Sequence, residues 1–516
     1  MIMHNSQKGF KNIAANIFAQ IISLALGVII PRLMLVNLGS EANGLFNTIG
    51  NVLVYVALLE AGVGAAATQA LYAPIASEDK IRVNSIVSAT DIFYKRTGRW
   101  YFVIILLLTF VFPLTITSTL PKWQIMAVMF LSGMPGVIKY YYQGKYIIFL
   151  RAEGHSYVLT NLSTVANIAT SLAKIALLII GCNIVELQAM YLVFNVAQVA
   201  FILFYVKKHY PWLNAKYTPD FKAISQSKNA MVHQISSLIF FNTDVVILTY
   251  FCGLKTVSVY SMYTMLFGII STAITNFSGA NFILGQSFNT NRERAIGLIE
   301  VYEIFNMVLT FSLFCIANIF ILPFMQLYTS GVTDINYIDK YLPYLIVSTY
   351  LLSNGRNSSS QIIEYAGHYK QTQWRAVIES VINIVVSIAC VFKFGIYGVL
   401  LGTIAALLYR TNDMIIYANK KILNRSPWKT YRRWLVNLAL FIVLTLLSKL
   451  IFTRIALDTY PRIILWAVVS CVIVIPLFFA VASLLDRETY HYAKELLSPY
   501  AKNAWGKVIG RLKPQR

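Results

Sequence analysis

The sequence predicts an all-α polytopic membrane protein, and three observations support this fold class: the composition, the spacing of apolar segments and an internal repeat. Of the 516 residues, 57% are hydrophobic and only 12% are charged, and the mean hydropathy is +0.63. An average soluble domain carries about 25% charged residues. The deficit extends along the whole chain. It excludes a water-soluble enzyme, a nucleic-acid-binding protein and a disordered protein.

The apolar segments number about 14, and each is long enough for a helix to cross a bilayer, which takes about 20 residues. Gly, Pro, Asn and charged residues separate them. The first is expected to be a retained span rather than a signal peptide, because no small-residue cleavage pattern follows it. The predicted spans are 11–36, 44–72, 99–117, 122–146, 157–181, 187–206, 229–252, 258–283, 297–322, 341–365, 373–392, 397–419, 434–452 and 461–484.

The net charge of +22 would suggest a nucleic-acid partner in a soluble chain, but here it follows from topology. With the N-terminus inside, thirty-one of the 43 Lys and Arg residues fall in cytoplasmic segments and seven in outer ones. Basic residues accumulate on the cytoplasmic side, so both termini are predicted to be cytoplasmic. The tail places Tyr490, Ala493, Leu496 and Leu497 at helical spacing and is expected to lie along the membrane surface.

The chain also repeats at an offset of about 214 residues, with landmarks that recur in one order. The matched landmarks are Gly39 with Gly253, Phe46 with Tyr260, the turn 152–155 with 366–368, Gly181 with Gly395, Lys207-Lys208 with Lys420-Lys421, and Pro211-Trp212 with Pro427-Trp428. Each copy covers six spans, so the copies are parallel and related by an axis along the membrane normal. Two such bundles flanking a cleft are the usual plan for moving a solute by alternating access.

The repeat defines the predicted domains. They are an N-terminal lobe at 1–210, a cytoplasmic linker at 211–228, a C-terminal lobe at 229–428, two further helices at 429–484 and a basic cytoplasmic tail at 485–516.

Five basic residues lie inside predicted spans, where each costs about 2.5–3.5 kcal/mol at the bilayer centre. They are Arg32, Lys139, Lys174, Arg356 and Arg410. Each either reaches an interface or an ion-pair partner, or binds a substrate. Arg356 and Arg410 lie about 15 Å from the nearest span end, too deep for easy access to the interface.

Lys139 and Arg356 occupy the fourth and tenth spans, which correspond under the repeat. Facing each other, they would form a cationic cleft, with hydroxyls and amides nearby from Tyr140–Gln143 and Ser358–Ser360. Such a lining suits an anionic head group that bears sugars. Structural pairing of the same bases is the alternative.

Five in-span acids are candidates for ion coupling: Glu60, Asp244, Glu364, Glu379 and Asp413. Asp413 follows Arg410 by three residues, so the two are placed to pair on one helix face. Asp244 has no base within a turn and either titrates, holds Na⁺ or makes a helix contact. No cofactor other than a coupling H⁺ or Na⁺ is expected. No metal-ligand spacing or catalytic constellation occurs, so an enzyme is not expected.

Four segments resemble the Wzx-type flippases of O-antigen and capsular repeat units, in the multidrug/oligosaccharidyl-lipid/polysaccharide exporter superfamily. They are Lys11-Asn12 with Pro31 and 38–46, then 241–244 with Gly253 and Tyr260-Ser261, then the outer loop 327–337, and last 366–373. Many members carry an Arg where Val36 stands here, and Arg32 lies one helical turn earlier.

The resemblance implies export of an undecaprenyl-pyrophosphate-linked oligosaccharide across the bacterial inner membrane. It further implies membrane lipids, a polysaccharide polymerase and a chain-length regulator as partners, and no nucleic acid. A cation-coupled multidrug and toxin extruder is the main alternative, although its substrates favour an acidic cleft. A sugar transporter of the major facilitator type would carry a Gly-, Asp- and Arg-rich turn that 73–82 lacks. A polymerase or glycosyltransferase would need a larger outer loop.

Overall fold

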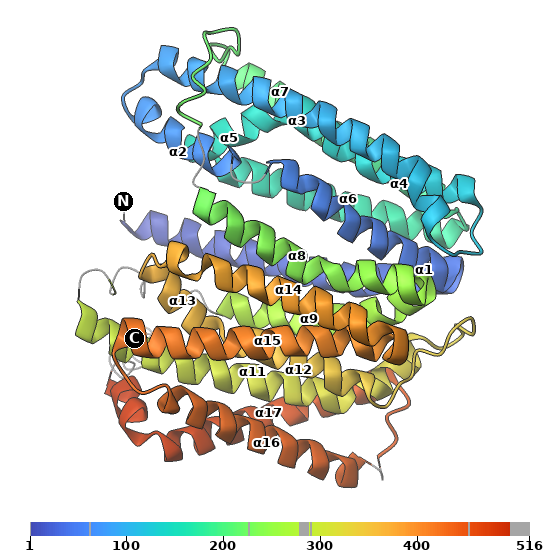
Figure 1. Ribbon diagram of the computed structural model, residues 1–516, viewed down its shortest axis with the longest axis vertical. Helices are drawn as coiled ribbons and strands as arrows, with labels where there is room; N and C mark the ends of the chain where they lie inside the picture. The colour runs from blue at the N-terminus through green and yellow to red at the C-terminus, as the bar shows by residue number, and fades with distance from the viewer. Residues whose placement is uncertain are drawn as a thin grey trace, which may run out of the picture. The chain divides into compact units, whose positions relative to one another are not determined.

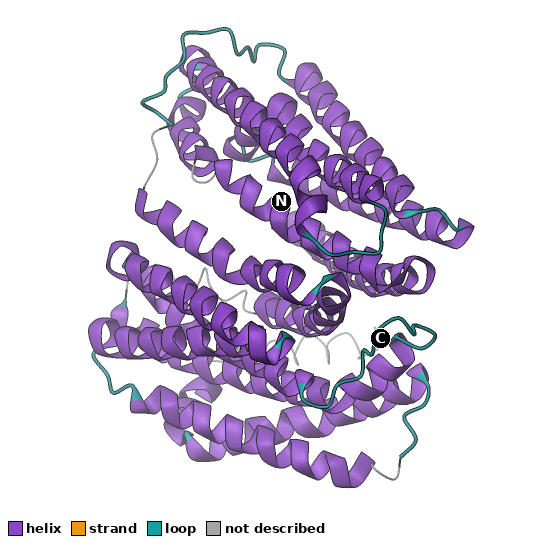
Figure 2. Ribbon diagram, turned by 45° about the vertical axis from the view of Figure 1, so that its right-hand side comes forward, coloured by secondary structure: helices purple, strands orange, loops and turns teal. Residues whose placement is uncertain are grey.

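The computed structural model describes residues 2–60, 63–224, 228–277, 288, 291–452 and 455–495. Within these ranges the regular secondary structure is helical and contains no strand (Figures 1 and 2). Eleven helices in the described ranges are long and apolar enough to cross a membrane. The predicted all-α polytopic membrane fold is therefore confirmed.

The three remaining predicted spans are helices that are merged or interrupted. The first two predicted spans run together in α1 (Ile2–Val56), with a non-helical kink at Gly39 (φ 82°, ψ 174°) between them. The fourth span is interrupted by a π-helical turn and the tenth by a break at Arg356. Interrupted helices within a membrane are tolerated where protein or a water-filled cavity satisfies the backbone, and π turns are frequent at functional sites.

Two compact units make up the chain. Unit 1 comprises Met1–Met265, Thr329–Tyr337 and Gln373–Thr403. Its helices are α1, α2 (Val63–Ala76), α3 (Lys80–Thr115), α4 (Lys122–Ile138), α5 (Gly144–Ala152), α6 (Ser156–Ile180), α7 (Ile184–His209), α8 (Lys228–Cys252), the first half of α9 (Leu254–Phe277), most of α14 (Tyr369–Phe394), and the short turns η1 (Ala57–Glu60) and η2 (Lys139–Gln143).

Unit 2 comprises Leu266–Tyr328, Ile338–Thr372 and Ile404–Arg516. Its helices are the rest of α9, α11 (Arg292–Tyr328), α12 (Leu342–Gly355), α13 (Asn357–Tyr365), most of α15 (Ile396–Tyr417), η3 (Ala418–Leu423), α16 (Trp428–Phe452) and α17 (Tyr460–Leu485). The lobe boundaries expected from the repeat stay a prediction.

Each unit has a core of its own. In unit 1, α2, α3 and α5 pack around Leu71, Ile86 and Phe149, whose side chains are almost fully buried. The linker packs against the start of α3, where the Asn84 side chain accepts the backbone N–H of Asn214 at 2.8 Å. In unit 2, α11 packs against α12, α16 and α17 (Figure 1). These contacts hold the N-terminal third of α11 beside the helices that bear the charged side chains described below.

The predicted repeat has a counterpart in backbone conformation. Glycines at matched positions all adopt a positive φ, a conformation that favours glycine. The matched pairs are Gly39 (82°) with Gly253 (83°), Gly154 (82°) with Gly367 (68°), and Gly181 (87°) with Gly395 (54°). Each of the turns that contain the second pair also makes a histidine–tyrosine contact, although the two tyrosines do not stand at matched positions. His155 Nδ1 lies 2.7 Å from the Tyr210 hydroxyl, and His368 Nδ1 lies 3.0 Å from the Tyr417 hydroxyl.

The tail is described only in part. Residues 487–495 are helical, with Tyr490 exposed and Ala493 buried. The placement of the tail along the membrane surface stays a prediction. Leu496, Leu497 and the rest of the predicted basic tail lie outside the described residues.

Candidate functional site

Asp244 lies at the centre of a buried polar cluster in unit 1. Its Oδ2 atom accepts hydrogen bonds from the Thr403 hydroxyl at 2.7 Å and the Tyr260 hydroxyl at 3.1 Å, and its Oδ1 atom accepts from Asn383 Nδ2 at 3.3 Å. These residues come from α8, α15, α9 and α14. The Asp244 side chain is almost fully buried. A buried carboxylate with neutral partners is suited to exchange a proton or hold a cation.

The surroundings of Asp244 are rich in oxygen. The Asn383 Oδ1 atom is buried and has no hydrogen-bond partner. One turn on, the Ser387 hydroxyl donates to the Val399 carbonyl at 3.1 Å. Carboxylate, amide and carbonyl oxygens are the ligands that hard cations prefer. The sequence singled out Asp244 but missed Asn383 and Thr403, since only the fold brings residues 139 and 159 positions apart into contact.

Lys139 begins the π-helical turn η2 in unit 1 and is partly buried. Within the described part of the chain it has no carboxylate at ion-pair distance. The tyrosines that follow it form an aromatic group: Tyr140 stacks on Tyr94 with ring centroids 5.9 Å apart, and Tyr141 and Tyr142 are exposed. The Tyr141 ring faces another base, because Lys95 Nζ lies 6.0 Å from its centroid.

Lys174 on α6 is also partly buried, and aromatic rings surround its ammonium group. The Nζ atom lies 5.0 Å from the centroid of Phe46 and 5.1 Å from that of Tyr191. Cation–π contacts of this kind stabilise a charge without neutralising it. Among the residues that the structure describes, no carboxylate pairs with Lys174. Its ammonium group is therefore held by aromatic rings and not by an ion pair.

The two in-span arginines of unit 2 are more constrained. Arg410 is almost fully buried, and its Nη1 atom lies 2.7 Å from the Asp413 carboxylate, the i,i+3 partner that the sequence indicated. Arg356 is buried at the junction of α12 and α13. Asp413 is thereby engaged as an ion-pair partner.

Arg32 lies on α1 close to the predicted outer loop. Its Nη2 atom donates to the Ser330 carbonyl at 2.8 Å. The same loop caps the Gly39 kink, where the Ser40 hydroxyl donates to Asp334 at 2.7 Å. The outer loop is therefore held against α1 by polar contacts within unit 1.

The three remaining candidate acids differ in their surroundings. Glu60 on η1 is partly buried and accepts a hydrogen bond from the Tyr94 hydroxyl. Glu364 on α13 is exposed, and Glu379 on α14 is buried. In the described ranges no three His, Cys, Asp or Glu residues are grouped as a metal site.

A second charged cluster, in unit 2, was missed by the sequence reasoning. Buried Glu303 on α11 accepts from Arg425 Nη2 and Arg433 Nη1, each at 2.7 Å. Arg433 also donates to Asp486 at 2.6 Å, and Lys429 pairs with Glu300 at 2.7 Å. We call these residues the unit 2 charge network. Glu300 and Glu303 were visible as in-span acids, but their partners lie more than 120 positions away.

Comparison with known proteins finds similar structures but no similar sequences. No family model and no curated protein sequence matches the chain. Among solved structures, the lipid II flippase MurJ in an inward closed conformation aligns with a TM-score of 0.65 at 14% identity, covering 92% of this chain and 98% of its own. An inward-facing multidrug resistance MATE family transporter of the MOP superfamily aligns with a TM-score of 0.62 at 14% identity, covering 78% and 95%.

The fold is that of the MOP-superfamily transporters. A further neighbour is a MOP superfamily transporter from Pyrococcus furiosus, described as having a binding pocket of reverse polarity, with a TM-score of 0.50 at 13% identity over 78% of this chain and 94% of its own. These neighbours are described as transporters or as a flippase. They leave the kind of substrate to be argued from this chain's own residues.

Proposed function

We propose that this protein is a flippase that moves an undecaprenyl-pyrophosphate-linked oligosaccharide across the bacterial inner membrane, with both termini in the cytoplasm. The fold is shared with a lipid II flippase over most of both chains. A pyrophosphate with a polar glycan cannot cross hydrocarbon unaided, because buried charges and hydroxyls without partners are costly. A protein with this function must supply cations and hydrogen-bonding groups inside the membrane.

The proposal rests on the surroundings of two lysines in unit 1. Lys139 and Lys174 lie in membrane-spanning helices without carboxylate partners in the described ranges. A lone ammonium group there is retained against its insertion cost of about 2.5–3.5 kcal/mol. An anionic ligand offsets that cost when it binds. We infer that the lysines bind the pyrophosphate, and that Tyr141 and Tyr142 contact the sugars.

Arg356 is the expected counterpart of Lys139 in the other half of the repeat. In the proposed cycle, the two halves alternately open to each side, and the phosphates pass between them bound to these bases. Arg410 and Arg32 contribute less, because Asp413 and the outer loop already engage them. The polyprenyl tail stays in lipid throughout. Export of this kind serves O-antigen or capsule synthesis.

Cation coupling is the second part of the proposal. The cluster of Asp244, Asn383 and Thr403 offers a buried carboxylate and an amide oxygen without a partner. Binding of Na⁺ or H⁺ there would give the cycle its direction. Glu60, Glu364 and Glu379 are the other candidates that the sequence offers for coupling.

The alternative is a multidrug extruder, which the likeness to a MATE family transporter favours. Substrates of such antiporters are mostly cationic. Lysines without carboxylate partners would repel such substrates and attract anions. The charge of the substrate therefore separates the two functions.

The test is complementation of a strain that lacks its repeat-unit flippase. Lys139→Ala with Arg356→Ala should abolish surface glycan, at least about 100-fold for two lost charge-assisted contacts, with lipid-linked intermediate accumulating on the cytoplasmic face. Lys139→Arg should restore export in part, and Asp244→Asn should slow it. Lys122→Ala with Arg99→Ala, which removes two exposed bases, is the matched control. Normal surface glycan in the first variant, at equal membrane abundance, refutes the flippase and favours the extruder.

A further inference from the structure

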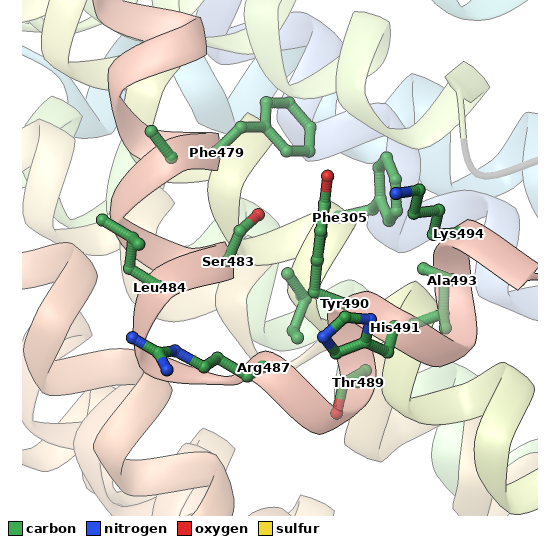
Figure 3. Close-up of a pocket in the computed structure, with 13 residues that line it drawn as sticks. Phe305, Phe479, Ser483, Leu484, Arg487, Thr489, Tyr490, His491, Ala493 and Lys494 are labelled. Carbon is green, nitrogen blue, oxygen red and sulfur yellow. The ribbon is translucent and has the colours of Figure 1, made fainter.

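A cavity of about 830 Å³ lies in unit 2 where α11, α17 and the helix at 487–495 meet (Figure 3). Its volume falls within the range of about 300–1,000 Å³ that is typical of small-molecule sites. The residues that line it are Val301, Ile304, Phe305, Phe479, Ala480, Ser483, Leu484, Arg487, Thr489, Tyr490, His491, Ala493 and Lys494. None of them belongs to the sites described above except Thr489, which contacts the unit 2 charge network.

The cavity has an apolar wall and a basic rim. α11 and α17 supply the wall, with Phe305 and Phe479 on either side of Tyr490 in Figure 3. The tail helix supplies three exposed side chains that are basic: Arg487, His491 and Lys494. No lining residue is acidic. The apolar wall therefore complements an acyl chain, and the basic rim complements the head group of an anionic lipid.

The basic rim is held in place but not neutralised. Asp486, at the start of the tail helix, accepts two hydrogen bonds from Arg433, and Thr489 accepts a third at 3.1 Å. These contacts fix the helix over the cavity. In contrast, Arg487 and Lys494 have no carboxylate at ion-pair distance among the residues that the structure describes.

The position of the cavity matches a membrane interface. It lies beside the C-terminal end of α17 and the N-terminal third of α11, both predicted to be at the cytoplasmic side. Basic pockets between helices on this side bind anionic head groups. An apolar cavity just below such a rim lies at the depth of the first part of an acyl chain.

We infer that this cavity binds one anionic glycerophospholipid from the surrounding bilayer. Its phosphate contacts the basic rim of Arg487, His491 and Lys494, and one acyl chain packs against Phe305 and Phe479. The Tyr490 and Ser483 hydroxyls lie between the two regions and can donate to the glycerol ester. The site is independent of the proposed transport function.

The experiment is native mass spectrometry of the full chain in detergent, with equal amounts of phosphatidylglycerol or phosphatidylethanolamine. Wild type should retain phosphatidylglycerol preferentially. Arg487→Gln with Lys494→Gln should weaken its retention about 25-fold, at roughly fivefold for each removed charge. Ser483→Phe, which fills the cavity and keeps the charges, should weaken binding of both lipids.

Lys216→Gln with Lys222→Gln is the matched control, since it removes two exposed charges from the linker, away from the cavity. Equal loss of phosphatidylglycerol in this control means that general surface charge, not the cavity, attracts the lipid, and overturns the inference. Equal retention of the two lipids by wild type overturns it as well. Melting temperatures of all variants establish that each remains folded.

Discussion

The two units treat basic side chains within membrane-spanning helices in opposite ways. In unit 1, Lys139 and Lys174 have no carboxylate partner in the described ranges, and aromatic rings surround the second ammonium group. In unit 2, Arg410 on α15 and Arg433 on α16 are each paired with a carboxylate at 2.7 Å. Lysines also pair in unit 1, where Lys145 on α5 contacts Asp91 at 2.9 Å. The contrast is therefore between Lys139 and Lys174 and the paired arginines of unit 2.

This difference separates structural charges from ligand-binding ones. A guanidinium group offers five donors in a rigid fork and can join two carboxylates at once, as Arg433 joins Glu303 and Asp486. An ammonium group on a flexible stem suits a ligand that arrives and leaves. The comparison teaches that paired arginines hold the helices of unit 2 together, whereas Lys139 and Lys174 of unit 1 are the bases that the proposed function assigns to an anionic ligand.

The largest effect is expected from breaking the unit 2 charge network at its centre. Glu303→Ala leaves Arg425 and Arg433 without a shared buried partner, and such a loss costs about 3–5 kcal/mol. Lys139→Ala breaks no ion pair, so it should cost less than about 1 kcal/mol. The melting temperatures of the two variants in detergent, read against wild type, measure the contrast.

Glu303→Gln is the control, since it keeps the shape and one acceptor oxygen and should fall between wild type and the alanine variant. If Lys139→Ala proves as destabilising as Glu303→Ala, then the lysine has a structural role and the distinction between the units fails.

The sequence predicted the helical fold well, because hydropathy and helix length are local properties. Periodicity and spacing also identified Asp244 and the pairing of Arg410 with Asp413, which lie one turn apart. They did not reveal Asn383 or the partners of Glu303, because these contacts join helices more than 100 positions apart. The spans predicted at Arg356 and at the π turn of Lys139 were unbroken, although Gly355 precedes the first interruption and Pro135 and Gly144 flank the second. Single Gly and Pro residues are tolerated in membrane-spanning helices, so they did not by themselves indicate a break.

Each unit contains a histidine–tyrosine hydrogen bond, and these two contacts allow a further comparison. His155 and His368 occupy matched turns, and each contacts a tyrosine hydroxyl, that of Tyr210 in unit 1 and that of Tyr417 in unit 2. Burial, followed by the nearby Glu153 carboxylate, raises the pKa of Tyr210 to about 12, so its hydroxyl stays protonated and keeps its hydrogen bond with the imidazole across the neutral pH range. Double-mutant cycles with His→Ala and Tyr→Phe should give similar couplings of about 0.5–1.5 kcal/mol in both turns.

The thermal stability of the four single and two double variants gives these couplings. A coupling energy in one turn and none in the other would mean that the two histidines have different roles. That result would weaken the case for the duplication.

The smallest effect concerns pH and the outer edge of the unit 2 charge network. Burial alone would raise the pKa of Asp486, but the Arg433 guanidinium outweighs burial and holds that pKa below its usual value. A carboxyl whose pKa is lowered on folding stabilises the fold fully above its unfolded pKa of about 3.9. That stabilisation is lost as the pH falls through the lower folded value. The melting-temperature difference between wild type and Asp486→Asn should therefore stay constant from about pH 8 to pH 5 and shrink below about pH 4. The control is Asp458→Asn, which removes an exposed i,i+4 partner of Arg462. Its melting temperature should differ little from that of wild type at any pH, because exposed ion pairs contribute little to stability. A difference for Asp486→Asn that already fades near pH 6 would mean that Arg433 does not hold this carboxylate, and the tail helix would then need another anchor.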